Sequence, residues 1–90
     1  MILLGLNLQC TCGACPEQYD VFDGDGKQVA YFRLRHGHFR ADVPDVGGKT
    51  VYACSCLGDG MFSSDTERDN VLTEACAAVL REARSAEREA

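Results

Sequence analysis

The sequence predicts an α+β domain, in which an antiparallel β-meander of four to five strands carries one C-terminal helix on one face. Two observations support this fold class. Up to about Cys56, short segments alternate apolar and polar residues with a period of two, as strands with one buried side do. From Ser64 onward, apolar residues recur every three or four positions, which is the spacing of an amphipathic helix.

Length and composition indicate one globular domain over residues 1–90. A chain of 90 residues with 46% hydrophobic and 26% charged residues can form one core and is not a disordered segment. The net charge of −5 argues against general binding to nucleic acid or anionic membranes. No segment is long enough to span a bilayer, and MILLGLNLQC lacks the basic n-region of a signal peptide. We therefore expect a cytoplasmic protein with no membrane partner.

Turn residues divide the first part of the chain into strands. Asp25-Gly26 is a strong hairpin turn because glycine accepts a positive φ at no steric cost, and Pro44 with Gly47-Gly48 ends the following hairpin. The expected elements are strands over Ile2–Gln9, Glu17–Phe22 and Lys49–Cys56, and a tight hairpin over Gln28–Val43 that turns at His36-Gly37.

The hairpin sets the register of the sheet. Its turn places Leu34 opposite Phe39 on one face and Arg33 opposite Arg40 on the other, so that like residues face each other. A slip of one residue would destroy this match. The neighbouring turns continue the same inner face, with the expected pairs Tyr19–Phe32, Val21–Ala30, Val43–Tyr52, Ala41–Cys54 and Phe39–Cys56.

The helix begins after Ser64, which forms a capping-box signature with Glu67. Its apolar stripe consists of Val71, Leu72, Ala75, Cys76, Val79, Leu80 and Ala83. Residues 84–90 have nothing to bury, and we expect them to fray.

Cysteines gather at one pole of this predicted fold because alternate turns of a meander lie at the same end. The pool comprises Cys10, Cys12, Cys15, Cys54 and Cys56, which is sufficient for tetrahedral zinc. The same spacing is typical of packed or surface thiols, and the even cysteine count leaves a disulfide framework open. If the first and last strands are opposite edges, the two groups lie roughly 19 Å apart. We expect no cofactor, with structural zinc as the alternative.

Catalytic signatures are weak. Cys12 and Cys15 form a C-x-x-C motif, but Pro16 and the following strand do not match its usual place at the start of a helix. His36 and His38 flank a turn and are expected to be exposed there. Neither GDG segment precedes the helix that a phosphate-binding loop requires. We therefore do not expect an enzyme.

The outer sheet face is the predicted partner-binding site. Arg33 opposite Arg40 is unfavourable unless an anionic or aromatic group lies between them. Arginine beside exposed aromatic residues is typical of binding hot spots and of sheets that stack single-stranded nucleic acid. The acidic net charge favours a protein partner, while coverage by other segments or by a homodimer mate is the alternative. The predicted contact residues are Phe22, Tyr31, Arg33, Arg35, His38 and Arg40.

The run CPEQYDVFDGDGKQVAYFRLRHGHFRADVPDVGGKTVY resembles a group of small uncharacterised proteins encoded by bacteriophages and actinobacterial prophages. The likeness extends from Cys12 to about Leu80. Cys12 and Cys15 match the group, whereas Cys10, Cys54 and Cys56 depart from it. The resemblance implies a phage accessory protein that binds and blocks a host protein or ribonucleoprotein complex, as anti-CRISPR inhibitors do, in the bacterial host cytosol.

Overall fold

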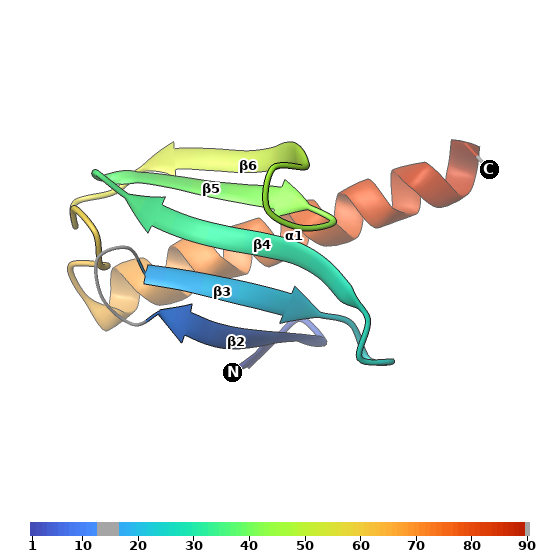
Figure 1. Cartoon of the computed structure of the whole chain (residues 1–90), viewed down its shortest axis with the longest axis horizontal. Coiled ribbons are helices and arrows are strands. Elements are labelled where there is room, and N and C mark those ends of the chain that lie inside the picture. Colours follow the sequence, from blue (N-terminus) through green and yellow to red (C-terminus); the bar gives the residue numbers. More distant parts are fainter. Residues whose placement is uncertain (13–16, 90) are drawn as a thin grey trace.

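The computed structural model of the chain describes residues 1–12 and 17–89 (Figure 1). The strands follow the order β1-β2-β3-β4-β5-β6, and every neighbouring pair is antiparallel. Helix α1 lies behind this sheet and runs diagonally across it. The predicted fold class is confirmed, although the meander has six strands rather than four to five. The elements are β1 (Ile2–Leu3), β2 (Leu6–Cys12), β3 (Glu17–Phe22), β4 (Gln28–Arg35), β5 (His38–Val43), β6 (Lys49–Ser55) and α1 (Asp65–Glu89).

The additional strand arises at the N-terminus, where the predicted strand Ile2–Gln9 is wrong. Leu4 and Gly5 both have positive φ, 52° and 83°, and they reverse the chain so that Leu3 pairs with Leu6. A two-residue hairpin loop of this kind needs positive φ at both central positions, which Gly5 accepts readily. Apolar residues on both sides of the turn mask it in the sequence, because their alternation continues through it.

The central register is confirmed. Leu34 lies opposite Phe39 and Arg33 opposite Arg40 across the β4–β5 hairpin. Tyr19 lies opposite Phe32, and Val21 lies opposite Ala30, between β3 and β4. The positions of the turns therefore determine the register, and with it which residues form the inner face.

The predicted register of the last strand is wrong by two residues. Tyr52 lies opposite Ala41 and Cys54 opposite Phe39, rather than opposite Val43 and Ala41. The turn after Val43 closes sooner than the sequence suggests, because the buried Asp42 carboxylate accepts hydrogen bonds from Thr50 Oγ1 at 2.8 Å and Gly47 N at 3.4 Å. A shift of two residues leaves each side chain on its predicted face.

Two β-bulges change the direction of Val29 and Val51, which strict alternation along their strands would place on the outer face. The register skips Val29 between the pairs of Val21 and Phe22, and it skips Val51 beside Ala41 and Asp42. Both valines are partly buried and pack against the core. An extra residue in one strand bends it locally, which explains why strict alternation fails at these positions.

The core lies between the inner sheet face and α1. Phe39 is its centre, with ring centroids 5.7 Å from Phe32 and 5.9 Å from Phe62. Phe62 comes from the loop before the helix, so this loop closes one end of the core. The helix contributes five fully or nearly buried residues, and all but Ala78 belong to the predicted stripe: Leu72, Ala75, Cys76, Ala78 and Val79. Helix α1 continues to Glu89, and the fraying of 84–90 stays a prediction.

Candidate functional site

A basic hollow lies on the outer face of the β4–β5 hairpin. Arg33 is directly opposite Arg40, and Arg35 is opposite His38, so the sheet register alone brings these side chains together. The hollow has a volume of about 410 Å³ and is lined by Arg33, Arg35, His36, His38 and Arg40. His36 was not among the predicted contact residues; its turn position, with φ 53°, presents it beside the strand residues.

Asp42 holds one side of the basic hollow in place. Its carboxylate is buried and lies 3.2 Å from Arg40 Nε. This contact relieves part of the repulsion between Arg33 and Arg40, because it fixes a negative charge beside one of them. Within residues 1–12 and 17–89, Arg33 and Arg35 form no ion pair with an acidic side chain. The hollow therefore keeps an excess of positive charge that an anionic group can neutralise.

The two aromatic residues of the predicted site do not join the hollow. Tyr31 is only 9% exposed, so its ring is not available to a partner in this conformation. Phe22 is half-buried and lines a different hollow, beside the β1–β2 turn. The alternation of β4 predicts the face on which Tyr31 lies but not its burial by neighbouring side chains. The observed site is basic rather than basic and aromatic.

The cysteines lie at one end of the sheet, as expected, but on strands that are far apart. Cys10 and Cys12 are on β2, and Cys54 is on β6, with three strands between them. Among the described residues, no three His, Cys, Asp or Glu side chains converge as a metal site would need. Cys15 lies outside the described residues. Zinc bound by both groups therefore requires an arrangement other than this strand order, and it stays a prediction.

Cys54 and Cys56 form a thiol pair, with their Sγ atoms 3.9 Å apart. Burial and then the neighbouring Cys54 raise the pKa of the Cys56 thiol to about 12. Cys76 is fully buried in the helix stripe, as predicted for a packed thiol, and burial raises its pKa to about 11. Both thiols are therefore protonated at neutral pH, which makes them poor nucleophiles.

A buried ion pair, which the sequence analysis missed, connects the sheet to the helix. Glu17 is 2% exposed, and its carboxylate lies 2.9 Å from Arg68 Nε and 3.3 Å from Arg68 Nη2. Tyr19 Oη and the Phe62 amide also donate hydrogen bonds to it. Burial alone would raise the pKa of Glu17, but the hydrogen bonds from Arg68, Tyr19 and Phe62 outweigh it and hold the pKa below its ordinary value.

The alternation of side chains along β3 contained a signal for this ion pair. Glu17 shares the inner face with Tyr19 and Val21, so an acidic residue there needs a partner from a covering element. Nothing in the sequence shows that Arg68 is this partner. All acceptor positions of the carboxylate face donors, which indicates a structural role rather than proton transfer.

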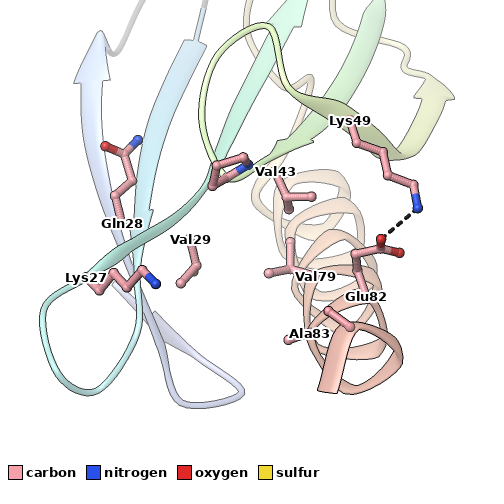
Figure 2. Close-up of a pocket in the computed structure, with 10 residues that line it drawn as sticks. Lys27, Gln28, Val29, Val43, Lys49, Val79, Glu82 and Ala83 are labelled. Carbon is pink, nitrogen blue, oxygen red and sulfur yellow. Dashed lines mark hydrogen bonds and ion pairs between the residues drawn. The ribbon is translucent and has the colours of Figure 1, made fainter. Parts of the chain in front are cut away.

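An apolar groove lies at the opposite end of the sheet from the cysteines. Figure 2 shows Val29 and Val43 of the sheet on one side, and Val79 and Ala83 of α1 on the other. Its volume is about 480 Å³. An ion pair of 2.6 Å between Lys49 and Glu82 bounds one side. The groove can take an apolar side chain, but its chemistry does not indicate a reaction.

Compared with known protein families, curated proteins and solved structures, the chain matches none of them. Within the part of the chain that the structure describes, no helix is both long and apolar enough to cross a membrane. The resemblance to small phage proteins therefore stays a hypothesis from the sequence.

Proposed function

We propose that this chain is a non-enzymatic binding module whose basic hollow docks an acidic surface of a partner protein. The observation that carries the proposal is the cluster of Arg33, Arg35, His38 and Arg40 on one rigid hairpin, within a chain of net charge −5. A local positive surface on an acidic protein selects partners by charge complementarity, since most of the remaining surface repels them.

Arginine suits this role because its planar guanidinium forms paired hydrogen bonds with carboxylates. The backbone of a central hairpin holds the side chains at fixed spacing, which lowers the entropy lost on binding. Protein is favoured over nucleic acid because the hollow contains few cations and neither predicted aromatic residue reaches it.

The resemblance to phage and prophage proteins supports a narrower version of the proposal. In that version the partner is a protein or ribonucleoprotein complex of the bacterial cytosol, such as a host defence complex, and binding inhibits it. The inhibitor role depends on the resemblance alone, whereas the docking face depends on the residues of the hollow.

Charge reversal tests the docking face. The tagged chain is used to capture partners from nuclease-treated bacterial lysate, beside a variant with Arg33→Glu and Arg40→Glu. The control carries Arg81→Glu and Arg84→Glu, the same charge change at exposed positions of α1. We expect captured protein with the parent chain and the control, and its loss with the hairpin variant.

Capture that survives the hairpin variant would refute the docking face, provided that circular dichroism shows all three proteins folded. Capture from untreated lysate that is absent from the nuclease-treated lysate would identify nucleic acid as the ligand and refute the protein partner. The zinc-stabilised alternative has its own measurement, which is metal content: about one zinc per purified chain would support it.

A further inference from the structure

Strand β6 is an open edge of the sheet. It pairs with β5 on one side only, and helix α1 lies on a face of the sheet rather than along this edge (Figure 1). Apart from the ladder to β5, the described residues form no backbone hydrogen bond with Thr50–Ser55. Its outward amides and carbonyls can therefore pair with another strand.

The edge lacks charge and proline, which are two of the usual protections against pairing. Natural edge strands carry charges, proline or β-bulges, or they are very short. The segment Thr50–Ser55 reads TVYACS, with no charge and no proline, and its bulge at Val51 leaves Tyr52–Ser55 regular. At the other edge of the sheet, β1 has only two residues and pairs with Leu6 and Asn7, so β2 beyond Leu8 also lies at an edge. Thr50–Ser55 of β6 is the longer of these two edge stretches.

Side chains next to this edge are half-exposed on the inner side and small on the outer side. Tyr52 and Cys54 pack against the core but remain partly accessible. Ala53 and Ser55 are exposed on the outer face, where neither would obstruct an added strand. An incoming strand would cover the apolar inner row while it completes the backbone hydrogen bonds.

We propose that two copies of this chain pair antiparallel through β6, about a two-fold axis at Ala53, and join their sheets into one. The proposal is independent of the docking function of the basic hollow. A second copy is the occupant because the strand is complementary to itself. With the axis at Ala53, Tyr52 lies opposite Cys54 of the second copy, and Ala53 lies opposite its own equivalent.

The alternation of side chains and the position of Lys49 select this register. Because side chains alternate between the two faces, the inner faces of the two copies lie side by side only if the two-fold axis passes through a residue. A centre at Tyr52 would bring Lys49 into the ladder opposite Ser55. The centre at Ala53 leaves Lys49 outside the paired segment, so no charge is desolvated. In the dimer the two basic hollows lie on one continuous outer face, with the β5 strands roughly 14 Å apart.

The oligomeric state of the full chain tests the proposal. Light scattering coupled to gel filtration, in reducing buffer, should give twice the chain mass of 9.8 kDa at the highest concentration. An interface of this size is a weak one, so we expect the dimer to dissociate below about 10 µM.

Ala53→Lys places like charges opposite each other at the axis and should weaken the dimer by about tenfold or more. Gln9→Lys adds the same charge at an exposed position of β2 and should leave the dimer unchanged.

Hydrogen exchange on the parent chain provides a second measurement that needs no variant. The outward amides of Thr50–Ser55 should be protected at high concentration and should exchange faster on dilution. A monomer at about 100 µM would overturn the proposal, because pairing of this kind would then be weaker than typical transient interfaces. A dimer that Ala53→Lys does not weaken, or whose protection lies elsewhere, would overturn it as well.

Discussion

At the scale of single residues, the Glu17–Arg68 pair is the most consequential contact of the molecule. It joins β3 to the first turns of α1, and Arg68 also lies 2.9 Å from Asp65 and stacks over the Phe62 ring at 5.9 Å. A buried carboxylate with its partners in place adds little net stability, but a carboxylate that loses its partner is costly. The pair therefore selects one way of docking the helix on the sheet.

Arg68→Met should destabilise the protein by about 3–5 kcal/mol, because Glu17 then stays buried without its counter-charge. The free energy of unfolding in urea measures this loss. Arg81→Met, at an exposed position of the same helix, is the control and should change stability by less than about 0.5 kcal/mol. Adding Glu17→Leu to Arg68→Met should restore part of the loss, since no unpaired charge remains. A loss under about 1 kcal/mol for Arg68→Met would contradict the structural role.

At the scale of elements, helix α1 shows how local sequence signals become structure. Ser64 Oγ accepts a hydrogen bond from the Glu67 amide at 3.1 Å, as the capping signature predicts. The carboxylate of Glu67 reaches farther back than a capping box requires. It accepts hydrogen bonds from the amides of Ser63 and Leu57, at 2.9 and 2.7 Å. The cap thus also fixes the loop that carries Phe62 into the core.

Ser64→Ala should lower the free energy of unfolding by about 1 kcal/mol, the usual cost of removing an N-cap hydroxyl. Ser64→Asp keeps an acceptor at the same position and should restore most of that stability. Urea unfolding of both variants checks the prediction. Equal losses in the two variants would show that the hydroxyl acts through something other than the cap.

The sheet contains features that local sequence signals do not predict. Turn residues predict the β4–β5 hairpin because glycine and alternation act over a few residues. The β6 register depends on Asp42, whose buried carboxylate organises the next turn, and the bulges at Val29 and Val51 depend on how strands twist together. These are tertiary effects, and they determine shifts of register that no alternation pattern contains.

At the scale of the whole molecule, one part of the candidate site could be predicted from local sequence signals, and the other part depends on tertiary contacts. All the basic residues of the hollow except His36 were predictable, since they share one hairpin face whose register the turn determines. The absence of Tyr31 and Phe22 from the hollow was not, because burial depends on side chains from other strands. The strand order also separates the cysteines of β2 from those of β6, which the sequence left open.

The pH dependence of global stability should reflect the buried carboxylate. The pKa of Glu17 is held below its ordinary value of 4.5, and hydrogen bonds from Ser63 and Leu57 lower the pKa of Glu67 as well. A carboxyl group with a depressed folded-state pKa stabilises the protein fully above its unfolded-state pKa. This stabilisation is lost as the pH falls through the folded-state value. We therefore expect the urea midpoint to be level near neutral pH and to decline below about pH 4.5.

Glu17→Gln is the variant that tests this assignment, because it removes the titrating group while it keeps an acceptor for Arg68. Its stability near neutral pH should be lower than that of the parent chain, and its decline in acid should be shallower. Glu67→Gln separates the contribution of the exposed cap from that of the buried pair. If both variants decline as steeply as the parent, the acid sensitivity arises from other carboxylates, and the depressed pKa of Glu17 has no part in it.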